Sequence, residues 1–359
     1  MKQFNINNLK STLQLNFKWK NSRLRLLSGF ITSLILVCTI NLTKIAPFLN
    51  TRIKTSSSYR SLQRFFKNFK IDYREYMHFV LKILPKQEKF FLVMDRTNWK
   101  FGHKDINILM LGIIYKHHCF PFCWELLHKQ GSSSTQERKQ LLSEAISVLG
   151  KDRIRAILCD REFIGVRWFG YLLSESIDFH IRLPKHIKAG SILKQNRKTV
   201  SEIFRIWKLN VKVSYPKQVN IFGYKLWLSG MKTEKDSCIV VSSNNDADSL
   251  GTYQLRWTIE NMFGAFKSRG FNFEDTHLKD YEKLKKLIAL VSIAYIWCIM
   301  VGLWVSESIK IRIATHGRKE RSIFRTGLDY LVSFIKKLLS GDIYNYQEAN
   351  TVIRFLSCT

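Results

Sequence analysis

The sequence predicts an α/β protein with an open sheet and a functional site along one edge of that sheet. Two short runs, Phe90 to Met94 and Ile154 to Cys159, are apolar apart from Arg155 and are followed by Asp95 and Asp160. Apolar runs of this length are typical of buried strands. Ligands of open α/β sheets bind beyond the carboxyl ends of the strands, so we expect both aspartates at one edge.

The segments around these runs predict the rest of the sheet. Ile106 to Tyr115 and Phe120 to Leu127 are two further strand candidates, and Ser132 to Leu149 is expected to be helical. Residues 178–245 alternate or carry β-branched runs between polar turns, which predicts a mostly β module inserted into the core. Its expected strands are Phe179 to Leu183, Leu209 to Tyr215, Ile221 to Leu228 and Cys238 to Ser242.

Residues 1–85 are basic and have the pattern of helices. Three serines, Ser56 to Ser58, can begin a helix that carries Arg60, Arg64 and Lys67 among apolar residues at helical spacing. This helix would be the second of two helices joined by a polar connection, and its cations would suit a DNA-reading helix. An ordinary solvated basic helix has the same pattern.

The charge of the chain points to a polyanionic partner. Lysine and arginine number 58 against 28 acidic residues, so the formal net charge is +30. Such an excess is the electrostatic footprint of a nucleic-acid-binding protein, with an anionic membrane surface as the second reading.

The seven cysteines are scattered and odd in number, and no secretory signal opens the chain. We therefore expect reduced cysteines in a cytoplasmic protein associated with the nucleoid. His117, His118, Cys119 and Cys123 lack the second pair of ligands that structural zinc needs, so we expect no zinc there.

Leu287 to Val305 has one serine and no charged residue, which by hydropathy alone would suit a membrane span. The strands before it need a helix to cover them, so we expect a core helix and no membrane. Residues 318–357 are expected to form one more basic amphipathic helix and a tail.

The segment Thr252 to Gly270 carries the most informative pattern. If it is one helix, a turn of about 100° per residue gathers four polar side chains in one stripe: Tyr253, Arg256, Glu260 and Lys267. The stripe on the other side is apolar and faces the core: Leu255, Ile259, Met262 and Phe266. A salt-bridge ladder would explain Arg256 and Glu260 but not the tyrosine in the same row.

Asp95, Asp160 and Glu260 together are suited to a pair of Mg²⁺ ions, with Mn²⁺ as an alternative, because hard carboxylate oxygens bind both. Two such ions can activate an attacking oxygen and stabilise a leaving one. Arg256 by a forked pair of donors and Lys267 as a point charge would hold a phosphate, and Tyr253 could donate a hydrogen bond to it.

These residues resemble the DDE transposases of bacterial insertion sequences, and most closely the subgroup with a Tyr-Arg-Glu-Lys helix. The resemblance is carried by Asp95-Arg96-Thr97-Asn98-Trp99, Asp160-Arg161-Glu162-Phe163 and Tyr-x-x-Arg-x-x-x-Glu with a lysine seven residues later. Smaller matches are Gly131 to Ser134 with Glu137-Arg138, and the segment from Ser57 to Phe66. Together they cover most of residues 56–305.

The resemblance implies a ribonuclease-H-like core with a β insertion before the last acid. In these terms we expect four regions: a helical DNA-binding region (1–85), the core (86–183 and 247–315), the insertion (184–246) and a C-terminal helical region (316–359). It also implies that Tyr253, Arg256 and Lys267 contact phosphates near the transposon end. A tryptophan of the insertion, Trp227 or Trp207, could stack on a flipped base.

The predicted function is cut-and-paste transposition on terminal inverted repeats and target DNA, by a homodimer in a synaptic complex. The resemblance further implies excision through a hairpinned end. Two alternatives stay open from the sequence: a catalytically silent DNA-binding protein, and a membrane-associated basic protein anchored by residues 287–305.

Overall fold

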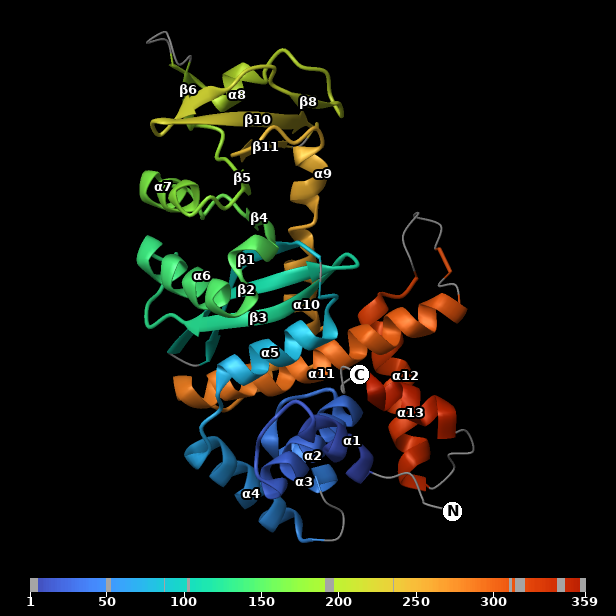
Figure 1. Cartoon of the computed structure of the whole chain (residues 1–359). Helices are drawn as coiled ribbons and strands as arrows, with labels where there is room; N and C mark the ends of the chain where they lie inside the picture. The colour runs from blue at the N-terminus through green and yellow to red at the C-terminus, as the bar shows by residue number, and fades with distance from the viewer. Residues whose placement is uncertain are drawn as a thin grey trace. The chain divides into compact units, whose positions relative to one another are not determined.

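The computed structural model describes residues 6–49, 53–86, 88–101, 104–190, 197–234, 236–309, 312–313, 320–340 and 346–355. The chain forms two compact units, which it enters more than once (Figure 1). The first comprises residues 1–86, 99–106 and 262–359, and the second comprises residues 87–98 and 107–261.

The first unit is helical. Its N-terminal helices are α1 (Ile6–Gln14), α2 (Asn21–Val37), α3 (Leu42–Leu49), α4 (Thr55–Asn68) and α5 (Tyr73–Ile83). Its C-terminal helices are α11 (Tyr281–Ser308), α12 (Ile323–Ser340) and α13 (Tyr346–Arg354). The expected single C-terminal helix is thus wrong, since the described residues form two helices there.

Helix α11 (orange in Figure 1) is the core of this unit and packs against α2, α4 and α12. By length and composition alone it could cross a membrane, with a mean hydropathy of 2.3 over its most apolar window. However, 83% of that window is buried inside the protein, as in a core helix. The burial supports the expectation of a core helix.

The second unit contains most of one large mixed sheet. The strands before the insertion are β1 (Phe90–Phe101), β2 (Lys104–Tyr115), β3 (His118–Leu126), β4 (Ile154–Cys159) and β5 (Phe179–Arg182). The later strands are β6 (Lys188–Gly190), β7 (Arg197–Thr199), β8 (Lys212–Ser214), β9 (Val219–Ile221), β10 (Tyr224–Lys232) and β11 (Ser237–Ser242). The order is β3-β2-β1-β4-β5-β11-β10-β9-β6-β7, with β8 paired to β10.

The centre of the sheet is parallel. β4 pairs parallel to both β1 and β5, whereas β2 with β3 and β5 with β11 are antiparallel. The parallel strands are joined by α6 (Thr135–Leu149) and α7 (Val166–Ser174), as parallel connections require. Ser134 and Glu137 form a capping box that fixes the start of α6.

The inserted β segment differs from the expected strands, since β6, β7 and the short helix α8 (Val200–Ile203) were not predicted and one predicted strand is divided. The single strand predicted from Ile221 to Leu228 is a hairpin of β9 and β10, in which Ile221 pairs with Tyr224. Phe222 and Gly223 form its two-residue turn with φ of 56° and 94°. Two consecutive residues with positive φ are typical of the tight turns that match strand twist. The apolar Phe222 has the pattern of a strand interior although it lies in this turn, which is why the sequence predicts one strand here.

Candidate active site

Asp95 and Asp160 lie side by side because their strands are adjacent and in register. The last parallel pair of β1 and β4 is Met94 with Cys159, so each aspartate is the next residue beyond this pair. β1 itself continues to Phe101, so Asp95 lies at the end of the parallel pairing rather than at the end of its strand. The expected meeting of the two acids at one sheet edge agrees with this register.

The environment of Asp95 favours the uncharged acid. Burial raises the pKa of its carboxyl to about 6, although the Arg256 guanidinium and the Arg96 backbone N–H act in the opposite direction. The carboxylates of Asp160 and Glu162 raise it further. A carboxyl pKa raised by burial and by neighbouring acids is typical of a functional site.

Arg256 joins the first and third acids. One terminal nitrogen of its guanidinium lies 3.2 Å from Oδ2 of Asp95, and the other donates to Oε1 of Glu260. The arginine side chain is 4% exposed and Glu260 is 53% exposed. A buried cation thus holds a largely buried carboxylate and a solvent-facing one together.

Tyr253 contacts the second acid. Its hydroxyl donates to Oδ1 of Asp160 at 3.3 Å, and burial raises the pKa of this phenol. Tyr253 is therefore a hydrogen-bond donor at neutral pH, as required of a group that holds an oxyanion.

The expected continuous helix from Thr252 to Gly270 is wrong. The segment forms α9 (Ser249–Gln254) and α10 (Trp257–Phe266), with a turn at Leu255 and Arg256. In this turn the Arg256 N–H donates to Tyr253 O at 2.9 Å, three residues back. Such 3₁₀ bonds tighten the helix and place residues i and i+3 on one side, which explains why Arg256 lies over the Tyr253 ring, 5.7 Å from its centroid.

A second pair of charged residues fixes the loop after Asp160. Nε and a terminal nitrogen of Arg96 each lie 3.3 Å from a carboxylate oxygen of Glu162. Arg138, buried on α6, donates to the Glu162 carbonyl at 3.0 Å and to the Ser133 carbonyl at 2.6 Å. These supports were missed at the sequence level, because no local pattern relates Arg138 to residues 24 positions away.

The remaining predicted site residues have other surroundings within their own units. Lys267 follows α10 in the first unit, where Nζ lies 2.9 Å from Glu274 Oε1. Trp227 is half-buried on β10 and pairs with Ser242 of β11. Arg60 and Arg64 are exposed on α4 and line a hollow of about 940 Å³ in the first unit, together with Lys67 and Lys283. The structure therefore brings together Asp95, Asp160, Glu260, Tyr253 and Arg256 of the nine predicted residues.

Comparison with known families defines the class of protein. The family described as "Transposase DDE domain" matches residues 86–297, which is more than half of the chain. The chain belongs to this family of DDE transposases. It is a DNA transposase, an enzyme that binds DNA, and the family generally works with divalent metal ions.

One solved structure with similarity is described as a cryo-EM structure of the piggyBac transposase synaptic complex with hairpin DNA. The two chains are 13% identical in sequence, and the match covers 98% of this chain and 82% of the other, with a TM-score of 0.45. No curated protein sequence matches the chain.

The acids fit divalent metal ions in donor chemistry, since all three offer the hard oxygens that such ions prefer. In the described part of the chain, no group of three or more His, Cys, Asp or Glu side chains lies close enough to hold an ion. Asp95 and Glu260 both contact the guanidinium of Arg256.

Proposed function

We propose that the chain catalyses cut-and-paste transposition of an insertion sequence. It would hydrolyse a phosphodiester at the terminal inverted repeats and then use the freed 3′-hydroxyl to attack target DNA. The observation that carries this proposal is the convergence of Asp95, Asp160 and Glu260, with Tyr253 and Arg256 between them. Three acids and two phosphate-binding groups are the parts that two-metal phosphoryl chemistry needs.

Asp95, Asp160 and Glu260 would hold Mg²⁺, or Mn²⁺ in its place. When bound, such ions lower the pKa of the attacking water and stabilise the leaving oxygen. The raised pKa of Asp95 supports this assignment, because a cation beside that carboxyl would stabilise its charged form.

Arg256 and Tyr253 would hold the phosphate that reacts. Both side chains already contact an oxygen anion, Arg256 on Asp95 and Tyr253 on Asp160. In the DNA-bound enzyme the guanidinium would exchange a carboxylate for a phosphate, which has the same forked acceptor geometry. Lys267, Arg60, Arg64 and a stacking Trp227 complete the proposed set of DNA-binding residues.

The strand order supports a ribonuclease-H-like core. Strands β1, β4 and β5 are parallel, β2 and β3 form an antiparallel pair beyond β1, and α6 and α7 join the parallel strands. The insertion would then begin after β5 and end before α9. The same proposal includes membership of the Tyr-Arg-Glu-Lys subgroup and excision through a hairpin. It also includes action as a homodimer, a nucleoid location and the four predicted regions.

The test is a nicking assay on the end DNA of the element with Mg²⁺, comparing wild type with Glu260→Gln. Glu175→Gln is a matched control, since Glu175 pairs with Lys151 just before β4 begins, at the end opposite Asp160. We expect nicking by wild type and by the control, and none by Glu260→Gln. End binding without nicking by any of the three would instead support a silent DNA-binding protein.

A further inference from the structure

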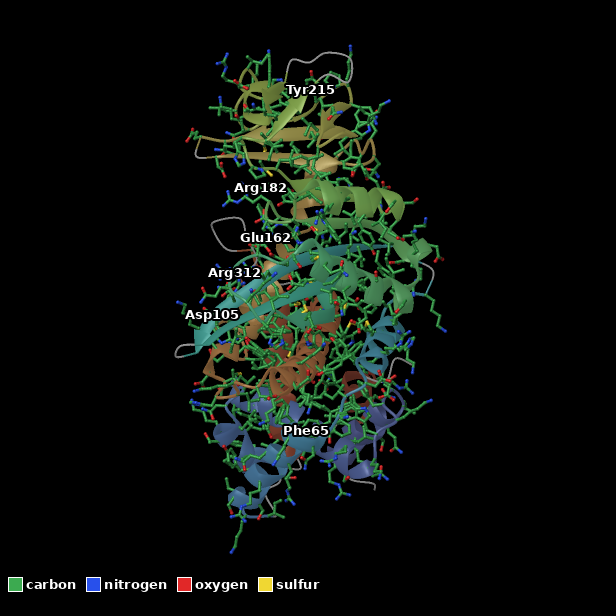
Figure 2. All side chains as sticks on the ribbon, turned by 90° about the vertical axis from the view of Figure 1, so that its left-hand side faces the viewer. Phe65, Asp105, Glu162, Arg182, Tyr215 and Arg312 are labelled. Atoms are coloured by element: carbon green, nitrogen blue, oxygen red, sulfur yellow. The ribbon has the colours of Figure 1, made fainter. Side chains whose placement is uncertain are left out.

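A basic groove begins at the loop that follows Asp160. Its volume is about 590 Å³, and its lining includes Arg161, Glu162, Arg182, Lys185 and His186. Glu162 and Arg182, both labelled in Figure 2, line this groove. No residue of this groove belongs to the acid triad, and its cations have no role in the proposed reaction so far.

The sheet places Arg182 next to the active site. β4 and β5 are parallel, and their last pair is Cys159 with Ile181. Asp160 and Arg182 are therefore the next residues on two neighbouring strands. The charge of Arg182 also acts to lower the pKa of the Tyr253 phenol, whose hydroxyl donates to Asp160.

Asp236 occupies the space between two of the cations. Its Oδ2 lies 2.8 Å from a terminal nitrogen of Arg182, and its Oδ1 lies 2.8 Å from Nζ of Lys185. The aspartate is 53% exposed, and a turn holds it through a hydrogen bond from its backbone N–H to the Thr233 hydroxyl at 3.0 Å. Hydrogen bonding by Lys185 is the main cause that lowers the pKa of Asp236 to about 2.

This arrangement has the chemistry of a phosphate site filled by a carboxylate. An arginine and a lysine converge on two oxygens of one solvent-facing anion, and a phosphodiester offers the same pair of oxygens with one negative charge. Exposed ion pairs contribute little to stability, so exchange for a phosphate costs little folding free energy.

The groove also continues away from the active site. Lys185 and Asp236 form part of the wall of a second hollow, of about 280 Å³, which leads to Arg205, Trp207 and Lys232. A strand that passed Asp160 and Arg182 would thus meet further cations and an aromatic ring, which is the combination used along bound single strands.

We propose that Arg182 and Lys185 bind a backbone phosphate of the DNA strand next to the reacting phosphodiester, and that Asp236 fills this site when DNA is absent. The proposal rests on the proposed function for the identity of the strand. The site reads the backbone and not the bases, so it would accept end DNA and target DNA alike.

The test is equilibrium binding of the full chain to fluorescent duplexes, with a chelator present so that cleavage cannot contribute. One duplex carries the element's end and the other has an unrelated sequence. We expect Lys185→Gln and Arg182→Gln each to weaken binding to both duplexes by about tenfold, the effect of losing a hydrogen bond to a charged group. A plot of the logarithm of the binding constant against the logarithm of the salt concentration has a negative slope, which should become shallower by about 0.9 in each variant.

Asp236→Asn gives the opposite and more specific expectation, since it removes the competing anion. Binding to both duplexes should become tighter by about two- to fivefold, the range of one exposed ion pair. In the double variant Arg182→Gln Lys185→Gln this gain of affinity should vanish, because Asp236 competes with DNA only for these two cations. Glu175→Gln also removes an acid from an exposed ion pair and should bind as wild type.

Unchanged affinity and salt slope in Lys185→Gln, in a variant that melts as wild type does, would overturn the proposal. A gain of affinity in Glu175→Gln equal to that in Asp236→Asn would also overturn it, because a general charge effect would then suffice. If the wild type showed no preference for end DNA, or no nicking in the assay above, only the proposed function would be contradicted. Binding to the unrelated duplex would still report on the phosphate site.

Discussion

The guanidinium of Arg256 lies 3.2 Å from the carboxylate of Asp95 and also donates to Glu260, so one buried cation links two of the three predicted metal ligands. This contact relates stability to catalysis. Arg256 compensates the acid charge of Asp95, just beyond the point where the parallel pairing of β1 and β4 ends. In the proposed reaction the same side chain would exchange a carboxylate for a phosphate.

Arg256→Met should therefore destabilise the metal-free protein. It leaves the buried Asp95 carboxyl without its cation, and loss of one partner of a buried ion pair costs roughly 3–5 kcal/mol. Urea denaturation with a chelator measures the change. The combination with Asp95→Asn should be less costly than the sum of the two single variants, because the uncompensated charge is then removed.

Arg325→Met is the control for this measurement. Arg325 pairs with Asp329 at 2.9 Å in an i, i+4 arrangement, as Arg256 does with Glu260, but Arg325 is exposed. Its removal should cost less than about 1 kcal/mol. Equal losses in the two arginine variants would contradict the special role of the Asp95 contact.

Mg²⁺ should stabilise the folded wild-type protein. An ion that binds only the folded state adds about 1.4 kcal/mol when its concentration is tenfold above Kd, which raises the melting temperature. Asp160→Asn should lose this increase while Glu175→Gln keeps it. Melting curves with and without Mg²⁺ test this without any DNA, and an undiminished shift in Asp160→Asn would remove that residue from the ligand set.

The stability of the second unit should depend on His180 below neutral pH. Its imidazole is 1% exposed, and Nδ1 lies 2.9 Å from the Ser242 hydroxyl. Burial lowers the pKa of His180, although the nearby Asp246 carboxylate acts in the opposite direction. The folded state then holds the neutral ring, while the unfolded chain binds a proton at its ordinary pKa of about 6.5.

Because the unfolded state binds more protons in this range, the free energy of unfolding should fall as the pH falls below about 6.5. We expect this dependence to be weaker in His180→Gln, when both are compared by chemical denaturation at pH 7.5 and pH 5.5. His186→Gln, which changes an exposed histidine, should follow wild type. The same pH dependence in both variants would show that other groups cause the loss.

Gly327→Ala should loosen the helical unit. A Cβ atom at Gly327 of α12 would lie 1.8 Å from the Cys298 carbonyl oxygen of α11, so the two helices would have to move apart. Overpacking of this kind typically costs about 1–3 kcal/mol. Ser333→Ala on the exposed face of α12 should change stability by less than about 0.5 kcal/mol. Thermal denaturation compares the two, and equal melting temperatures would contradict the close contact.

The elements that could be predicted from the sequence are those whose pattern is local. The apolar runs at Phe90 and Ile154 predicted two buried strands, and the structure has β1 and β4 there. Ser134 just before α6 and Glu137 in its first turn have the spacing of a capping box, which is a local pattern. The turn at Phe222 and Gly223 and the break at Leu255 and Arg256 escaped, because each depends on a backbone conformation that apolar spacing does not reveal.

The sequence by itself determined the chemistry available to this protein: three acids, a tyrosine and an arginine at recognisable spacing, on a strongly basic chain. Only the tertiary structure decided which of them meet. Parallel register puts Asp95 beside Asp160, and a 3₁₀ turn directs Arg256 onto both Asp95 and Glu260. The tertiary structure also brings Asp236 onto Arg182 and Lys185, more than 50 positions earlier in the chain. Contacts between residues dozens of positions apart depend on strand order and packing, which no local pattern encodes.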